Sequence, residues 1–167
     1  MRSIFTAIVC VVLFTACSKS AATDSDSQGK NVMDEEKIIS EVLEVEDRLI
    51  SLYRQGAFLD ALAVDLDSKN FRCIKNGKIE TYDELAARYK KMVVDNQVKQ
   101  MDYQINDQHF NVINADNVLS TLSVKLTMTM RNGSTLVQDS LAETILWQRI
   151  DDRWRLAHYH ASELPKQ

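Results

Sequence analysis

The sequence predicts an α+β domain in which a curled antiparallel sheet wraps around a long N-terminal helix. Apolar residues recur with the helical period in the first half of the chain and with the strand period of two after Asp95. The 167 residues, 45% of them hydrophobic and only one a proline, fit a single domain. Helices followed by long strands are the order typical of an α+β fold.

The first predicted helix begins at Asp34, whose side chain can cap it, and ends near Gly56. Apolar side chains recur along it at steps of three and four residues, from Ile38 to Leu52. A second, shorter helix is expected over residues 58–66. Its inward-facing residues are expected to be Phe58, Leu59, Leu62 and Leu66.

A β-hairpin and a third helix are expected next. The hairpin turns at Asn76-Gly77, a dipeptide that strongly favours a tight hairpin turn. Thr81 and Glu84 can form a capping box at the start of the helix that follows. One face of that helix is expected to carry Tyr82, Leu85, Tyr89 and Met92.

Long strands follow, separated by turns rich in Asn, Asp and Gly. They are expected over residues 101–112, 121–130, 135–150 and 154–162. In the second of these strands apolar and polar residues alternate, so one face is apolar and the other carries hydroxyl groups and Lys125. The apolar face is expected either to lie beneath the helices or to mediate self-association, and the second is favoured here. It consists of Leu122, Val124, Leu126, Met128 and Met130.

The N-terminus has the pattern of a secretory signal peptide, with Arg2 followed by a short apolar run. Its end, Leu13-Phe14-Thr15-Ala16-Cys17, resembles the bacterial lipobox, which implies cleavage before Cys17 and lipidation of that thiol. The expected organisation is a signal peptide over 1–16, a lipidated Cys17 with a flexible tether over 17–31, and a domain over 32–167. The expected location is the bacterial cell envelope, at the outer membrane facing the periplasm or the surface. An ordinary secreted protein is the alternative.

Charge and cysteine content exclude several classes of protein. The formal charge of −4 argues against nucleic acid as a partner, because neutralising phosphates requires clustered Lys and Arg. Once Cys10 leaves with the signal and Cys17 is lipidated, Cys73 has no partner for an intrachain disulfide and is expected to be a packing residue. No cofactor is expected.

The second half of the chain resembles the nuclear transport factor 2-like, or SnoaL-like, superfamily, and within it the association (hub) domain of calmodulin-dependent protein kinase II. The resemblance rests on residues whose spacing matches the hub domain without a gap. They are Glu143-Thr144, Trp147, Arg149, Asp151, Trp154, His158-Tyr159-His160, Ser162 and Pro165, with Lys125-Leu126-Thr127 upstream. The resemblance implies a cone-shaped sheet with a pocket at its mouth and an outer face that supports dimers or rings.

The hub-domain pocket is lined by basic residues, of which this chain keeps one. Two of the family's arginine positions fall on Ile145 and Ala161, and the third falls on Lys125. The loss of two arginines weakens the expectation of carboxylate binding, which bidentate guanidinium groups favour. The pocket candidates implied by the resemblance are Lys125, Glu143 and Tyr159, with Tyr53 contributed by the first helix.

His158 and His160 are further pocket candidates, because residues two apart on one strand share a face. They could act as a metal-binding pair or as an acid–base group, since histidine titrates near neutral pH. A zinc site would need a third ligand from His109, Cys73 or a carboxylate. Structural histidines that only form hydrogen bonds are the favoured alternative, so no metal is predicted.

Two functions remain open for the pocket. Relatives in the superfamily isomerise or cyclise substrates in such a cone, and a buried carboxylate beside a phenol could do so here, with Glu143 and Tyr159 in those roles. Glu143 could instead pair with Lys125 or Arg155. The favoured prediction is a homodimeric or larger module that binds a small molecule or a partner without catalysis. The alternatives are a cofactor-free isomerase, cyclase or hydrolase, and a purely scaffolding module.

Overall fold

The structure, a computed structural model, describes residues 27–64, 69–95 and 97–163, with side chains from Glu35 onward. Its helices are α1 (Ser27–Gln55), α2 (Phe58–Ala61), the 3₁₀ helix η1 (Leu62–Val64) and α3 (Tyr82–Val94). Its strands are β1 (Arg72–Lys75), β2 (Lys78–Glu80), β3 (Val98–Asn114), β4 (Asn117–Met130), β5 (Thr135–Ile150) and β6 (Arg153–Glu163).

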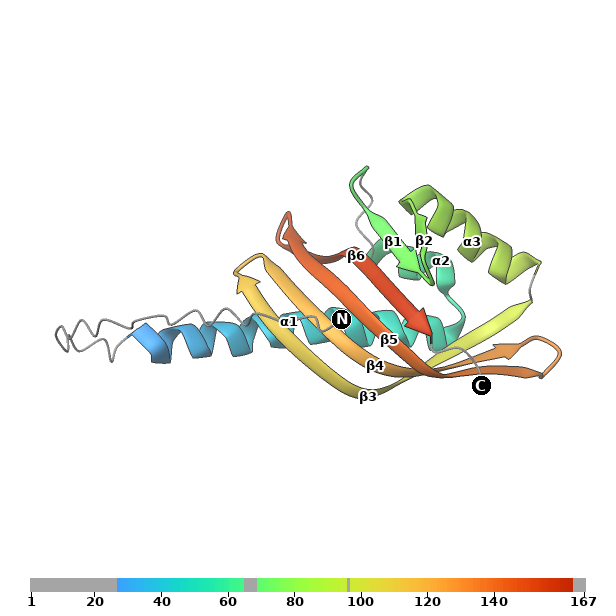
Figure 1. The fold of residues 1–167 in the computed structure, drawn as a ribbon. Coiled ribbons are helices and arrows are strands. Elements are labelled where there is room, and N and C mark those ends of the chain that lie inside the picture. Colours follow the sequence, from blue (N-terminus) through green and yellow to red (C-terminus); the bar gives the residue numbers. More distant parts are fainter. Residues whose placement is uncertain (1–26, 65–68, 96, 164–167) are drawn as a thin grey trace, which may run out of the picture.

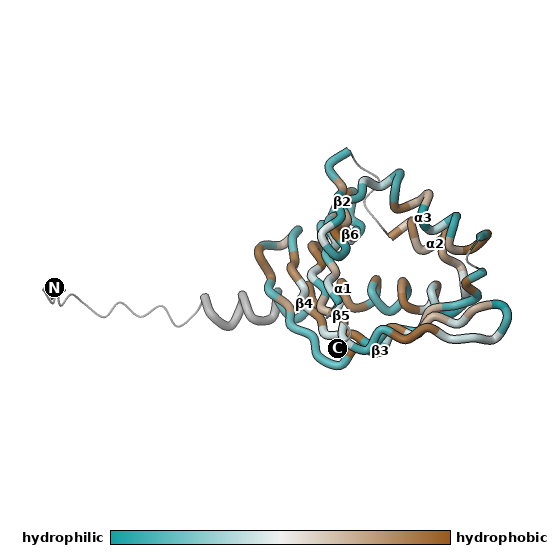
Figure 2. Tube along the Cα trace, turned by 45° about the vertical axis from the view of Figure 1, so that its right-hand side comes forward, coloured by the Kyte–Doolittle hydropathy of each residue, from teal (hydrophilic) through white to brown (hydrophobic). Residues whose placement is uncertain are grey.

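The six strands form one curled, unclosed sheet in the order β2-β1-β6-β5-β4-β3 (Figure 1). All neighbouring strands are antiparallel except β1 and β6, which run parallel. Figure 2 shows α1 inside the curve of the sheet, with α2 and α3 towards one end of it. The predicted α+β class, with a curled sheet around the N-terminal helix, is confirmed; the parallel pair was not predicted.

Helix α1 begins at Ser27, before the predicted start at Asp34, so the tether residues 27–31 are helical here. No proline interrupts this segment, which lets the helix extend towards the N-terminus. The predicted signal peptide, Cys17 and the rest of the predicted tether lie outside the described residues. None of the described helices is long and apolar enough to cross a membrane.

Helix α1 ends in a Schellman motif at Gly56, which confirms the predicted end of the helix. Gly56 N–H donates to the Tyr53 carbonyl at 3.1 Å, and Ala57 N–H donates to the Leu52 carbonyl at 2.9 Å. Gly56 has a φ of 74°, a left-handed conformation that glycine adopts at little cost. The chain therefore turns sharply into α2 at this point.

The second helix is shorter than predicted. It continues as η1 and its expected end lies in residues 65–68, outside the described part of the chain. Phe58 and Leu62 are buried as predicted, but Leu59 is 49% exposed and was wrongly assigned to the core. Ala61 and Val64 are buried instead, because the tightening to a 3₁₀ helix changes which residues face inward.

The predicted hairpin and third helix are confirmed. Asn76 and Gly77 join β1 to β2 with φ values of 50° and 81°, the pattern of a type I′ turn. The Thr81 hydroxyl accepts from the Glu84 backbone N–H, and the Glu84 carboxylate accepts from the Thr81 backbone N–H, which completes the capping box. These two signals are local, so tertiary packing does not override them.

The apolar face of β4 lies beneath the helices, and the favoured prediction that it mediates self-association is wrong. Val124 and Leu126 are 1% and 3% exposed, and both line an internal cavity together with Leu122 and Met128. This inner face packs with the apolar sides of α1 and α3 in one core. Burying that face removes apolar area from water, which is the main favourable term in folding.

Candidate functional site

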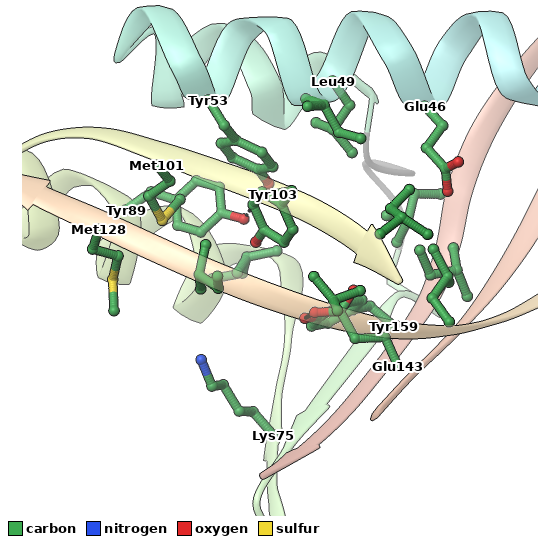
Figure 3. A pocket seen from close by; sticks show the side chains of 18 of the residues that line it. Glu46, Leu49, Tyr53, Lys75, Tyr89, Met101, Tyr103, Met128, Glu143 and Tyr159 are labelled. Atoms are coloured by element: carbon green, nitrogen blue, oxygen red, sulfur yellow. Dashed lines mark hydrogen bonds between the residues drawn. The ribbon is translucent and has the colours of Figure 1, made fainter. Parts of the chain in front are cut away.

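The cone encloses a cavity of about 150 Å³ between the concave face of the sheet, α1 and α3. A cavity of this size holds a ligand of roughly one benzene ring. Most of the wall is apolar, built from leucine, isoleucine, valine, methionine and aromatic side chains. Polar side chains also line the cavity, and Figure 3 labels seven of them: Glu46, Tyr53, Lys75, Tyr89, Tyr103, Glu143 and Tyr159.

Glu143 and Tyr159 form a buried hydrogen-bonded pair on the sheet wall of this cavity. They lie on β5 and β6, where Glu143 pairs with Ala161 and Tyr159 with Ile145 in register, so their side chains emerge as neighbours on the same face. The Tyr159 hydroxyl donates to Glu143 Oε1 at 2.6 Å, and Glu143 is only 6% exposed. The sequence placed both residues at the pocket, and the structure brings them together there.

Burial controls the acidity of this pair. Loss of hydration raises the pKa of the Glu143 carboxyl, while the Tyr159 hydrogen bond and the nearby Lys75 lower it and Glu46 raises it. The pKa of the Tyr159 phenol is raised well above its ordinary range, first by burial and then by the Glu143 charge. Tyr159 therefore keeps its proton, and Glu143 is a stronger base than an exposed carboxylate.

Glu46 is a second buried carboxyl at the same cavity, contributed by the middle of α1. It is 4% exposed, and both its oxygens accept from the Gln108 side-chain amide on β3, at 3.0 and 2.8 Å. Burial raises the pKa of Glu46, the Gln108 hydrogen bond lowers it, and Asp47 raises it. None of the ion pairs among the described side chains involves Glu46 or Glu143.

Tyrosine side chains gather at one end of the cavity. The hydroxyl groups of Tyr53 on α1 and Tyr89 on α3 are 2.6 Å apart and share a hydrogen bond. The rings of Tyr53 and Tyr103 stack with their centroids 5.4 Å apart. Tyr53 was a pocket candidate on sequence grounds, and the structure places it at the cavity. These phenols provide hydrogen-bonding groups within an otherwise apolar wall.

Two cationic side chains also reach the cavity, and they differ in their partners. Arg88 on α3 forms an ion pair with the buried Glu80, with Nε 2.9 Å from Oε2. Lys75, at the end of β1, lines the cavity, and Figure 3 shows its ammonium group extending towards it. Among the described ion pairs, none includes Lys75. Arg88 thus has a carboxylate partner within the protein, one that it shares with Lys78.

Lys125 lies outside the cavity, contrary to the prediction. Its neighbours Val124 and Leu126 face inward, so alternation along β4 directs Lys125 to the outer face of the sheet. There its ammonium group lies 3.5 Å from Asp139 Oδ1. The hub-like cation is therefore not part of this pocket, and Glu143 pairs with neither Lys125 nor Arg155.

His158 and His160 also lie on the outer face. A β-bulge between β5 and β6 pairs Trp147 with Leu156 but Leu146 with His158, so Ala157 is an extra residue. The bulge reverses the alternation, which places Leu156 and Tyr159 inward and both histidines outward. Within the described part of the chain, no three His, Cys, Asp or Glu side chains gather as metal ligands.

Sequence reasoning missed several residues of the site, chiefly Glu46, Lys75, Tyr103 and Arg88. Glu46 could have been found, because it lies four residues after Val42 and three before Leu49, on the apolar face of α1. A carboxylate in such a stripe marks a buried polar group. The other three carry no such local signal, since their positions depend on how α3, β1 and β3 pack.

A second hollow lies outside the cone, between α1 and the turn that joins β5 to β6. Its charged side chains are of both signs, including Glu41, Glu44, Arg153 and Arg149. Arg149 forms an ion pair with Glu41, and its guanidinium lies 4.7 Å from the centre of the Trp154 ring. This hollow is more polar than the cone cavity, and the Arg149–Glu41 ion pair lies within it.

A family model described as the SnoaL-like domain matches residues 42–166. The chain belongs to the SnoaL-like family. The match spans most of the cone, including the Glu143–Tyr159 pair and the part of α1 that carries Glu46. No curated protein sequence matches the chain closely enough to count as a relative.

Solved structures of the nuclear transport factor 2-like type share this SnoaL-like fold. A proposed scytalone dehydratase from Novosphingobium aromaticivorans superposes with a TM-score of 0.69 at 4% identity, covering 80% of this chain and 89% of that one. A proposed dehydratase from Streptomyces avermitilis gives 0.65 at 16% identity, covering 78% and 99%. A proposed calcium/calmodulin-dependent protein kinase II association domain from Xanthomonas campestris gives 0.60 at 13% identity, covering 92% and 100%. At these identities the similarity shows the fold alone.

Proposed function

We propose that this SnoaL-like domain binds a small organic molecule in the cone cavity, with the Glu143–Tyr159 pair as its polar anchor. The observation that carries the proposal is a buried, hydrogen-bonded carboxyl on the wall of an otherwise apolar cavity of about 150 Å³. Small-molecule sites are typically concave and apolar, with a few precisely placed polar groups that fix the ligand's orientation.

A purely structural role explains this arrangement less well. Burying a carboxyl is costly, and replacing buried charged groups by well-packed apolar residues is often neutral or stabilising. Two such carboxyls, Glu46 and Glu143, face the same cavity. A ligand that completes their hydrogen bonding gives a reason for their presence that packing alone does not.

Native mass spectrometry of the protein purified without denaturation tests the binding proposal. We expect an extra mass of a small molecule, lost in Val124→Phe, because the larger side chain fills the cavity from β4. Leu136→Phe, at a site 44% exposed and outside the cavity, is the control and should keep the mass. A ligand mass that persists in Val124→Phe would contradict binding in the cone.

Cofactor-free acid–base catalysis in the same cavity is the second candidate. The raised pKa of Glu143 makes it a stronger base than an exposed carboxylate. Once Glu143 has taken a proton from the substrate, the Tyr159 hydroxyl, which donates to Glu143 in this structure, can donate to a developing oxyanion instead. Isomerisation, cyclisation and hydrolysis can use such a pair, and elimination of water, the reaction in the names of two similar structures, can use the same kind of acid–base chemistry.

Exchange of the protons beside the carbonyl of cyclohexanone in deuterated water distinguishes catalysis from binding. If Glu143 acts as a base, the protein accelerates this exchange and Glu143→Gln removes the acceleration. If the cavity only binds, exchange with the wild-type protein equals that in buffer. Both proteins must fold, which their circular dichroism spectra establish.

The lipid anchor at Cys17, the envelope location and the homodimer remain proposals that rest on the sequence. The lipobox-like segment supports the anchor, and the hub-domain resemblance supports self-association. In a bacterial host, Cys17→Ala should move the protein from the membrane to the soluble fraction. A protein that stays equally in the membrane would contradict anchoring through Cys17.

A further inference from the structure

We infer that the preferred ligand of the cone cavity is a small organic cation, a protonated amine attached to an apolar body of about one ring. This inference rests on the proposed function and adds the chemical class of the ligand. It follows from two cavity carboxyls that have no ion-pair partner among the described side chains, from their burial, and from the size of the cavity.

The two cavity carboxyls form no ion pair with any described side chain. The cavity-lining charged side chains are Glu46, Glu143, Lys75 and Arg88. Arg88 pairs with Glu80, which the Lys78 ammonium group also contacts at 3.2 Å. No described ion pair includes Glu46, Glu143 or Lys75. A ligand with one positive charge gives the two carboxyls the charged partner that these side chains do not provide.

The two carboxyls are also the more deeply placed charges. Glu46 and Glu143 are 4% and 6% exposed, whereas Lys75 is half-buried at the end of β1. Their hydrogen-bond donors, the Gln108 amide and the Tyr159 hydroxyl, carry no charge. A carboxylate held only by neutral donors in an apolar cavity gains more from an ammonium group than an exposed one does, because charge–charge attraction is stronger where water is excluded.

The rest of the wall suits the apolar part of such a ligand. Tyr53, Tyr89, Tyr103 and Tyr159 provide aromatic rings, whose faces attract cations, and Met101 and Met128 provide polarisable sulfur atoms. The volume of about 150 Å³ limits the apolar body to roughly one ring. Benzylammonium meets these requirements, and benzyl alcohol and benzoate are its neutral and anionic counterparts of nearly the same shape.

Isothermal titration calorimetry of the whole protein with these three probes tests the inference. We expect benzylammonium to bind at least about tenfold more tightly than benzyl alcohol, the ratio that one charge-assisted hydrogen bond provides. Benzoate should bind most weakly. Equal affinities for benzylammonium and benzyl alcohol, or tightest binding of benzoate at Lys75, would overturn the cation inference and leave the proposed binding function intact. No binding of any probe would count against both.

Amide variants of the two carboxyls provide the second measurement. Glu143→Gln and Glu46→Gln should each weaken benzylammonium by about tenfold while changing benzyl alcohol little, because only the cation uses the negative charge. The control is Glu44→Gln, which removes a carboxyl from the exposed side of α1 and should change neither probe. Equal losses for both probes would show that the variants alter the cavity's shape and not its charge, and would overturn the inference.

The pH dependence of benzylammonium binding is the third measurement. It would not change if Glu143 had only a structural role. The groups that act on the pKa of Glu143 are Tyr159 from β6, Lys75 from β1 and Glu46 from α1. The other titratable side chains that line the cavity are Tyr53 from α1, Arg88 and Tyr89 from α3, and Tyr103 from β3. A cation favours the ionised carboxyl, so its binding should release protons and strengthen as pH rises from acid. Titrations in buffers of different ionisation enthalpy measure that release. Binding without proton release, and with the same affinity at acid and neutral pH, would contradict it.

Discussion

At the scale of single residues, Glu143 and Glu46 decide how the folded protein responds to pH. Burial raises the pKa of both carboxyls above the ordinary value of 4.5. Between that value and the raised folded-state pKa, the unfolded chain has lost a proton that the folded protein still holds. The free energy of unfolding therefore falls as pH rises through this window, by about 1.4 kcal/mol for each carboxyl and each pH unit that the window spans.

Glu143→Gln and Glu46→Gln should remove that part of the pH dependence. A glutamine side chain keeps an oxygen that can accept the same hydrogen bond but does not ionise. Relative to the wild-type protein, each variant should gain stability as pH rises above about 4.5. Urea unfolding at several pH values measures this, with Glu44→Gln as the control. Parallel stability profiles for the wild-type protein and both variants would contradict the raised pKa values.

At the scale of elements, the junction between α1 and α2 depends on Gly56. Its φ of 74° is left-handed, and a Cβ at this position would overlap the Lys99 carbonyl oxygen at the start of β3. Gly133, in the turn before β5, also has a left-handed φ, of 87°, but nothing lies within 4 Å of the Cβ position there. The two glycines thus share the backbone conformation and differ in crowding.

Gly56→Ala should therefore destabilise the fold more than Gly133→Ala. Both substitutions cost roughly 1 kcal/mol because alanine is strained in the left-handed region. Gly56→Ala should add about 1–3 kcal/mol, since the α1–α2 junction must move away from the start of β3. Chemical denaturation of both variants measures the difference. Similar losses for the two would show that the approach to Lys99 does not matter.

The elements show which parts of the fold could be predicted from sequence. The α1 stop at Gly56, the Asn76-Gly77 turn and the Thr81–Glu84 capping box are set by neighbouring residues, and each was predicted correctly. The direction in which side chains point along the strands was not predicted correctly. The bulge at Ala157 reverses the inward set in β6, so His158 and His160 face outward. Bulges arise from strand pairing, and the alternation of a single strand does not reveal them.

The candidate site, like the fold, could be predicted from the sequence only in part. Glu143, Tyr159 and Tyr53 were placed at the pocket from the resemblance, and the structure finds them there. Lys125 was misplaced because the hub-domain resemblance put it on the pocket side, and that placement in turn assigned the apolar face of β4 to an outer surface. Lys75 lies at the cavity because β1 joins the sheet parallel to β6, and Arg88 lies there because α3 packs over the concave face. Neither arrangement depends on residues that are close in sequence, so the sequence pattern did not reveal these two side chains.

At the scale of the whole molecule, the proposed function requires that the cone be a binding site and not only a packed core. The sheet, α1 and α3 together enclose the cavity, and each contributes polar groups to it. A ligand there contacts elements from both halves of the sequence at once. Binding should therefore stabilise the domain as a whole.

Titration of the isotope-labelled protein with benzyl alcohol, followed by amide NMR shifts, tests that central claim most directly. We predict shift changes concentrated on α1, α3 and the inner residues of β3 to β6, and their loss in Val124→Phe. Ile145→Phe, which fills the cavity from β5, should give the same loss. Changes confined to the outer face of the sheet, or unaltered by both filling variants, would contradict binding in the cone.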